Sequence, residues 1–156
     1  MNKTNAMRAL DRAGVAYEVR EYTLEGDEAI AEQVAAQLGM APETVFKTLA
    51  VRGDQSGPLL ALVPAPSSLN LRLLSQASGN KRCEMVALRD VLELTGYQRG
   101  AVTPLATKKA YPLYVDETAE LWPLIGISAG IRGLELILTP ADLVRATGAI
   151  LADIAE

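Results

Sequence analysis

Lys47 is the side chain whose type and surroundings most favour chemistry. It lies in residues 46–51 (FKTLAV), where the period-two alternation of a strand places Lys47, Leu49 and Val51 on one face. Both faces are mostly apolar, so we expect a strand covered on both sides. A lysine there must reach the sheet edge, pair with an acid or stand in a pocket. A strand-end lysine is the commoner arrangement, and an ammonium that stabilises a substrate oxygen is the functional alternative.

The second candidate is a short loop, residues 100–104 (GAVTP), which lies between an expected helix end and the basic pair at 108–109. Its glycine permits close approach of the backbone, and its proline stiffens the loop. Such a loop can aim backbone N–H and C=O groups at a ligand. The same spacing also occurs in ordinary connections, so by itself it leaves both interpretations open.

Three further polar residues are candidates for the same pocket. Tyr22 ends an expected strand, Ser128 begins a glycine turn and Asp142 lies in the first turn of the last expected helix. Each also has an ordinary structural role: packing for the tyrosine, a local hydrogen bond for the serine and a favourable dipole interaction for the aspartate.

The absence of histidine excludes many mechanisms. With no histidine and one cysteine, the chain has no Ser–His or Cys–His triad, no histidine metal ligand and no Cys₄ zinc site. Cys83 has no base near it in sequence, so we do not predict a nucleophile there. The glycine run at 126–133 fits neither dinucleotide nor P-loop patterns. Chemistry must therefore rest on lysine, hydroxyls, carboxylates, backbone dipoles or the substrate itself.

The charge is unevenly distributed along the chain. The formal net charge is −4, which argues against strong nonspecific binding of nucleic acid. Residues 72–109 nevertheless carry a net +4, against −3 for residues 1–71 and −5 for residues 110–156. This pattern is either ordinary fluctuation or a middle segment that meets phosphate.

Length and patterning predict one soluble intracellular domain of the α/β (α+β) class. The 156 residues are 49% hydrophobic and 22% charged, a single cysteine suits a reducing cytoplasm, and no apolar stretch approaches the ~20 residues of a membrane span. Hairpins mixed with single helices predict a mixed, largely antiparallel sheet. The expected helices cover residues 4–14, 28–38, 69–78, 87–95 and 139–147, with a helical turn at Pro42; the expected strands cover 15–22, 46–52, 59–63, 113–115, 125–128 and 134–138.

Four separated blocks together resemble the YbaK/EbsC family of aminoacyl-tRNA deacylases, and within it the branch that acts on Cys-tRNA(Pro). The blocks are residues 3–22, VFKTL at 45–49, LELTGYQRGAVTPLATKKAYP at 92–112 and ISAGIRGLELILTPADL at 127–143. The resemblance implies one editing domain over residues 1–156, with a curved mixed sheet surrounded by helices. It also implies release of a wrongly attached amino acid from the tRNA 3′ end, without a cofactor or metal.

The resemblance also implies roles for particular residues. Lys47 corresponds to the family's essential lysine, and the backbone of the 100–104 loop to the segment that holds the aminoacyl group and the terminal adenosine. The full set of substrate-binding residues implied is Tyr22, Thr48, Gly100, Ala101, Val102, Thr103, Pro104, Ser128 and Asp142.

In the mechanism that the resemblance implies, the cysteinyl thiol attacks its own ester, so no protein nucleophile is needed. Cys-tRNA(Pro) is then the expected substrate, with Cys-tRNA(Cys) a second one; tRNA binding is weak, and prolyl-tRNA synthetase is a candidate partner. Three alternatives remain: deacylation of Ala- or Ser-tRNA, a non-catalytic module that binds aminoacyl-tRNA or a synthetase, and a small-molecule enzyme unrelated to tRNA.

Overall fold

The computed structural model describes residues 2–24 and 31–156. Most of its elements were expected from the sequence, including the β2–β3 hairpin and the last helix. In chain order they are α1 (Asn5–Arg12), β1 (Glu18–Glu21), α2 (Ala31–Leu38), the 3₁₀ turn η1 (Pro42–Thr44), β2 (Phe46–Gly53), β3 (Gly57–Pro64), α3 (Leu71–Ser78), β4 (Cys83–Met85), α4 (Leu88–Thr95), β5 (Leu113–Asp116), the 3₁₀ helix η2 (Glu117–Leu121), β6 (Ile125–Ser128), β7 (Leu134–Leu138), α5 (Pro140–Thr147) and β8 (Ile150–Ala152).

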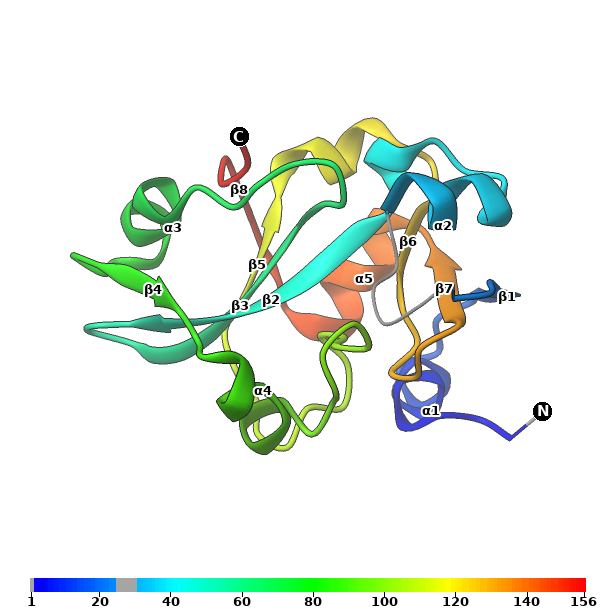
Figure 1. Ribbon diagram of the computed structural model, residues 1–156, viewed down its shortest axis with the longest axis horizontal. Coiled ribbons are helices and arrows are strands. Elements are labelled where there is room, and N and C mark those ends of the chain that lie inside the picture. The colour runs from blue at the N-terminus through cyan, green and yellow to red at the C-terminus, as the bar shows by residue number, and fades with distance from the viewer. Residues whose placement is uncertain (1, 25–30) are drawn as a thin grey trace.

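The strands form two open sheets that meet at the start of β2. One sheet has the order β1-β7-β6 and the other the order β4-β2-β3-β5-β8 (Figure 1). A bridge between Val45 and Gly126 joins β6 to the residue that precedes β2. The β3–β5 and β5–β8 pairs are parallel and the remaining pairs antiparallel. The predicted α+β class with a mixed, largely antiparallel sheet is confirmed.

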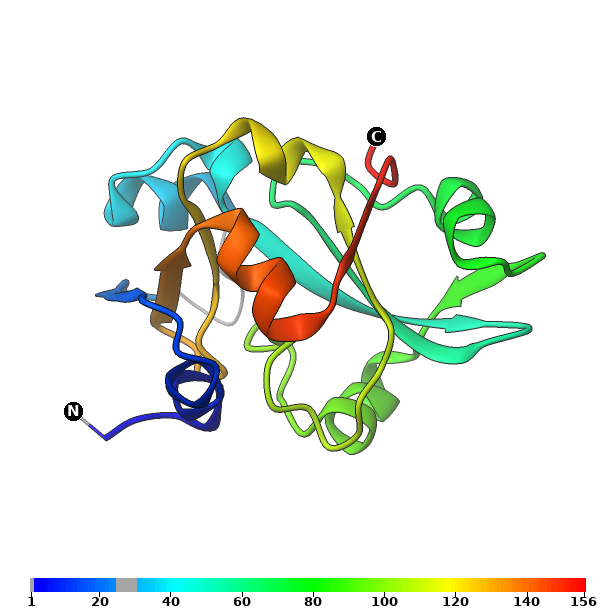
Figure 2. The same cartoon turned by 180° about the vertical axis from the view of Figure 1, so that it is seen from behind.

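Apolar residues cover both faces of β2, as predicted, and both faces of its partner β3. On one face Phe46 and Ala50 join a core that includes Leu143 of α5 and residues of α1, β6 and β7. On the other face Val51 packs with Leu74 of α3 and with the C-terminal segment. Figure 2 shows α5 and α3 set against different parts of the long hairpin. The hairpin is therefore central, and its first residues lie where the two sheets meet.

Local signals account for the helix ends. Thr4 and Thr139 accept hydrogen bonds at the N-termini of α1 and α5, from the backbone N–H of Met7 and Asp142. The glycines after α3, α4 and α5 adopt the left-handed conformation that ends these helices. No helix within the described ranges is long and apolar enough to cross a membrane.

The structure differs from the sequence prediction at four elements. The expected strand at 15–22 is paired only over β1, because only Glu18–Glu21 meets β7. β4 and β8, of three residues each, and η2 were not predicted. These short edge strands exist because β2 and β5 offer them partners, which sequence alternation does not reveal. Residues 28–30 of the second expected helix lie outside the described residues.

Candidate active site

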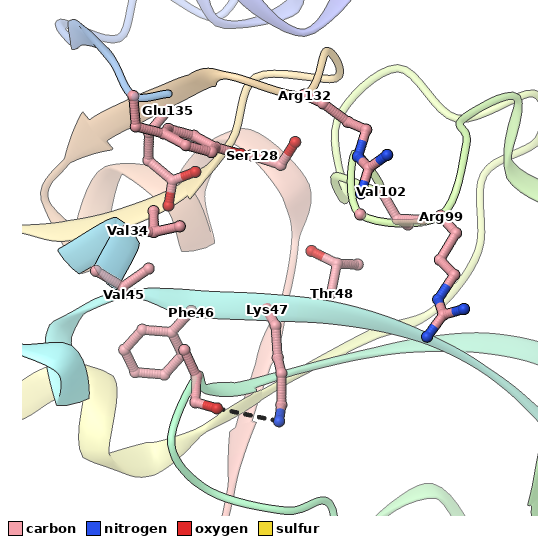
Figure 3. A pocket seen from close by; sticks show the side chains of 13 residues that line it. Val34, Val45, Phe46, Lys47, Thr48, Arg99, Val102, Ser128, Arg132 and Glu135 are labelled. Carbon is pink, nitrogen blue, oxygen red and sulfur yellow. Dashed lines mark hydrogen bonds between the residues drawn. The ribbon is translucent and has the colours of Figure 1, made fainter. Parts of the chain in front are cut away.

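A pocket of about 340 Å³ opens where the two sheets meet. Its walls come from the start of β2, the loop after α4, the end of β6 and the start of β7 (Figure 3). This volume lies near the lower end of the range for small-ligand sites, roughly 300–1,000 Å³. The lining residues are Tyr22, Val34, Val45, Phe46, Lys47, Thr48, Ala65, Arg99, Gly100, Val102, Ser128, Arg132 and Glu135.

Lys47 reaches the pocket from the second position of β2. Its Nζ donates a hydrogen bond to the carbonyl oxygen of Ala65 at 3.1 Å, and no ion pair within the described part of the chain involves it. Burial lowers the pKa of Lys47 below its usual value. An ammonium has three donors, so the bond to Ala65 leaves others for a ligand. Lys47 is thus one of the residues that line the pocket, and its ammonium points toward Ala65, on the opposite side of β2 from Thr48 (Figure 3).

Thr48 contributes a hydroxyl from the opposite face of β2 (Figure 3). The residue is only 9% exposed, and its buried Oγ1 has no hydrogen-bond partner among the residues that the structure describes. A buried hydroxyl without a partner carries an energetic cost of about 1–3 kcal/mol. A polar ligand atom in the pocket would remove that cost.

Ser128 ties the 100–104 loop to the end of β6. Its Oγ donates to the carbonyl oxygen of Ala101 at 3.0 Å and accepts from the N–H of Gly130 at 3.1 Å. Gly100 itself has φ +85° and lines the pocket. The serine therefore holds the loop in register with the glycine turn, as well as facing the pocket.

Tyr97, which is not part of the pocket lining, contacts both the loop after α4 and the glycine turn between β6 and β7. Its hydroxyl donates to the carbonyl oxygens of Leu105 and Ala106, at 2.6 and 3.2 Å. Its ring packs on Gly130, where an added Cβ would lie 2.8 Å from the ring carbon Cε1. Only a glycine leaves room for this contact, so ring and turn are fitted to each other.

We therefore expect Gly130→Ala to lower the free energy of unfolding by about 2–4 kcal/mol, because the new Cβ meets a rigid ring and φ is +94°. Urea denaturation measures this loss. Gly148→Ala is the matched control: φ is +71° there, but the space for a Cβ is open. Equal losses in the two variants would mean that backbone strain, and not the Tyr97 contact, accounts for the effect.

Glu135 is a buried carboxyl at the opposite end of the pocket from Arg99 (Figure 3). It is 4% exposed, on β7 opposite Ser128 of β6. Burial raises its pKa to about 8, so the carboxyl is largely protonated at neutral pH. Burial also raises the pKa of the neighbouring Tyr22 hydroxyl. This end of the pocket is consequently uncharged near neutral pH.

The raised pKa of Glu135 implies a pH-dependent stability. The unfolded carboxyl ionises near 4.5 and the folded one near about 8, so between these values the folded state holds the extra proton and stability falls as pH rises. Glu135→Gln has no such proton, and its gain over wild type should grow across this window to an upper limit on the order of 3 kcal/mol near neutrality. Denaturant titrations of both proteins at several pH values measure the gain. A gain that is constant with pH would contradict the shifted carboxyl.

Arg99 and Arg132 supply positive charge at the end of the pocket opposite Glu135. Arg99 follows α4 and Arg132 belongs to the β6–β7 turn, and both line the pocket near Val102 (Figure 3). Sequence reasoning did not select either arginine or Glu135 as a site residue. The available signal for Glu135 was a single carboxylate in the otherwise apolar run LELIL, at 134–138.

The structure gathers most, but not all, of the predicted site residues. Tyr22, Lys47, Thr48, Gly100, Val102 and Ser128 line the pocket. Ala101 and Thr103 of the 100–104 loop are buried and do not line the pocket, and Pro104 is half-buried outside the lining. Asp142 also lies outside the lining: its carboxylate accepts from Arg145 at 3.0 Å on the surface of α5. That pair lowers the pKa of Asp142.

Metal ligands are not grouped in the part of the chain that the structure describes. No cluster of three or more Cys, Asp or Glu side chains capable of holding a metal ion occurs there. Cys83 is buried on β4, close to the hydroxyl of Ser78 and outside the pocket lining.

Comparison with known proteins defines the class. Residues 26–146 match the model of the aminoacyl-tRNA editing domain. The chain belongs to this family, and the family and enzyme class predicted from the four sequence blocks, aminoacyl-tRNA deacylase, are confirmed.

Particular relatives agree with this class. The chain is 40% identical to EbsC of Enterococcus faecalis, a candidate Cys-tRNA(Pro)/Cys-tRNA(Cys) deacylase, over 97% of this chain and 93% of EbsC. Its fold is similar to that of a candidate trans-editing enzyme for prolyl-tRNA synthetase, with a TM-score of 0.86, 28% identity and coverage of 100% and 99% of the two chains. The hypothetical protein APE2540 is similar too, with a TM-score of 0.88, 25% identity and coverage of 98% and 100%.

Proposed function

We propose that this deacylase releases cysteine from mischarged Cys-tRNA(Pro), and that it also accepts Cys-tRNA(Cys). The observation that carries the proposal is a small pocket that combines the Lys47 ammonium, the Thr48 hydroxyl and the 100–104 loop. Its end near Val34, Val45 and Glu135 is apolar or uncharged, which suits a small neutral side chain. The 40% identity to EbsC supports the same substrate.

We propose further that residues 1–156 work as one free-standing editing domain, with prolyl-tRNA synthetase as its partner. The similarity to a trans-editing enzyme for that synthetase supports this partnership. A cytoplasmic location is consistent with the same reaction and stays a prediction.

In the proposed reaction the substrate supplies the nucleophile. The cysteinyl sulfur, after loss of its proton, attacks the ester carbonyl carbon; the carbon–oxygen ester bond breaks, and the ribose oxygen leaves and takes up a proton. The products are a cyclic cysteine thiolactone and tRNA with a free hydroxyl. A free thiol has a pKa of about 8.5, so a useful fraction ionises near neutrality.

The protein then has two tasks, which are to orient the cysteinyl group and to stabilise the oxyanion that develops on the carbonyl. We assign the second task to the Lys47 ammonium together with backbone N–H groups of the 100–104 loop. Ser128 serves the first task, because its bond to Ala101 holds the loop in position. Thr48 is placed to bond a polar atom of the bound group.

The test is deacylation of tRNA(Pro) charged with cysteine, alanine or serine, at enzyme concentrations below those of the substrates. We expect release of cysteine to be fastest by at least roughly tenfold, which corresponds to one well-placed substrate interaction. Faster release of alanine or serine would overturn the cysteinyl assignment and leave the deacylase class intact. Binding of the charged tRNAs without any release would favour a non-catalytic module.

A further inference from the structure

The charged groups of the pocket are unevenly distributed. Arg99 and Arg132 lie at one end, beside Val102, whereas Glu135 lies at the other end with Val34 (Figure 3). The two arginines come from separate elements, the loop after α4 and the β6–β7 turn. Their convergence is therefore a product of the fold and not of sequence proximity.

Both arginines adjoin the loop that we assign to oxyanion stabilisation. Arg99 immediately precedes Gly100, and the Arg132 guanidinium packs over it: a Cβ added to Gly100 would lie 3.1 Å from Nε of Arg132. A group that leaves the ester site past Gly100 therefore passes guanidinium groups. In an aminoacyl-tRNA, the atoms that follow the ester are the terminal ribose and then the phosphodiester chain.

A guanidinium group suits this end of the pocket to an anion. Among the described residues that line the pocket, the charged ones are Lys47, Arg99 and Arg132 and the carboxyl of Glu135. Burial raises the pKa of that carboxyl to about 8, so it adds little negative charge at neutral pH. A guanidinium can hold phosphate oxygens through two parallel hydrogen bonds, whereas an aminoacyl group offers no comparable anion.

We propose that Arg99 and Arg132 bind the phosphodiester groups of the last nucleotides of the tRNA acceptor strand. This inference rests on the proposed function and extends it: the substrate is then an ester carried by an RNA 3′ end, and an ester of adenosine alone is a poorer one. Binding through few phosphates also agrees with a chain of net charge −4, which holds tRNA weakly.

Two substrates distinguish binding of phosphodiester groups by these arginines from a role at the ester itself. One is 3′-O-cysteinyl adenosine, which has no phosphodiester; the other is the cysteinylated trinucleotide CCA, which has two. We expect Arg99→Ala and Arg132→Ala each to lower kcat/KM on the trinucleotide roughly tenfold and to leave the adenosine ester nearly unchanged. Arg52→Ala is the matched control, because Arg52 is exposed at the other end of β2 and lines a different hollow.

The adenosine ester also reports on folding, since a misfolded variant would lose activity on both substrates. Equal losses on the two substrates in a folded variant would place the arginine at the ester and overturn the proposal. Unchanged kcat/KM on both substrates would show that these arginines do not contact RNA.

If wild type cleaves neither substrate, the proposed function fails, and binding still tests the arginines. Fluorescence anisotropy with labelled, uncharged CCA should show affinity that falls with salt, with a logarithmic slope of about −0.7 for each phosphate bound. Arg99→Ala and Arg132→Ala should make that slope shallower, and Arg52→Ala should not. An unchanged slope in the first two variants would refute the phosphate role independently of catalysis.

Discussion

Lys47→Ala should lower kcat/KM for release of cysteine from Cys-tRNA(Pro) by roughly 100- to 1,000-fold, the usual cost of removing one oxyanion donor. The amine is held at the pocket by its bond to Ala65. Its burial lowers the pKa of Lys47, which reflects a low-dielectric setting where a positive charge acts strongly on a developing oxyanion. Single-turnover deacylation with labelled cysteine measures the effect.

The fold should survive this substitution. Lys47 is half-buried and makes one hydrogen bond to the backbone, so its loss should lower the free energy of unfolding by only about 1 kcal/mol. Lys81→Ala removes the same charge from an exposed position outside the pocket lining and should keep full activity. If Lys47→Ala retains wild-type rates, the lysine is a structural strand-end residue and the proposed mechanism loses its oxyanion donor.

S-methylation of the substrate's cysteinyl group should reduce deacylation of Cys-tRNA(Pro) by more than roughly 1,000-fold. The thioether cannot form the thiolate, and intramolecular attack owes its speed to effective concentrations of about 10⁵ M or more. The chain has no histidine to activate a hydroxyl of the pocket, and Cys83, its one thiol, is not among the described residues that line the pocket. Release of labelled amino acid from the two charged tRNAs, with trapping of the thiolactone, measures the difference.

Seryl-tRNA(Pro) provides the control for pocket fit, because the hydroxyl is close in size to the thiol but ionises far less readily. It should bind in competition with Cys-tRNA(Pro) and react slowly. Rapid release of S-methylcysteine as the free amino acid would show that water is the nucleophile. In that case Lys47 and the 100–104 loop would serve hydrolysis instead of cyclisation.

The fold was largely predictable because most of its elements are defined by local signals. The alternating and apolar runs at 125–128 and 134–138 became β6 and β7 with the expected bounds, and the Thr139–Pro140 cap began α5 as predicted. β4 and β8 carry no such signal. Each has three residues that pair with an edge of the larger sheet, so their strand conformation depends on partners distant in sequence.

Two acidic residues in the 127–143 block show that local sequence patterns do not identify which residues line the pocket. Asp142 was the sequence candidate, but it lies on the surface of α5, paired with Arg145. Glu135 was not selected, yet β7 turns it into the pocket beside Tyr22. The spacing of a strand and of a helix tells which residues share a face, but not which faces of separate elements will meet.

The sequence by itself determined most of the elements, the family and the residue types available for chemistry: no histidine, a lysine in an otherwise apolar strand and a GAVTP loop were visible without coordinates. Tertiary structure alone decided the composition of the pocket. The meeting of β2 with β6 brings Lys47, Ser128 and Glu135 to one site, although they are far apart along the chain. Burial there, which depends on those long-range contacts, holds one proton on Glu135 and lowers the pKa of Lys47.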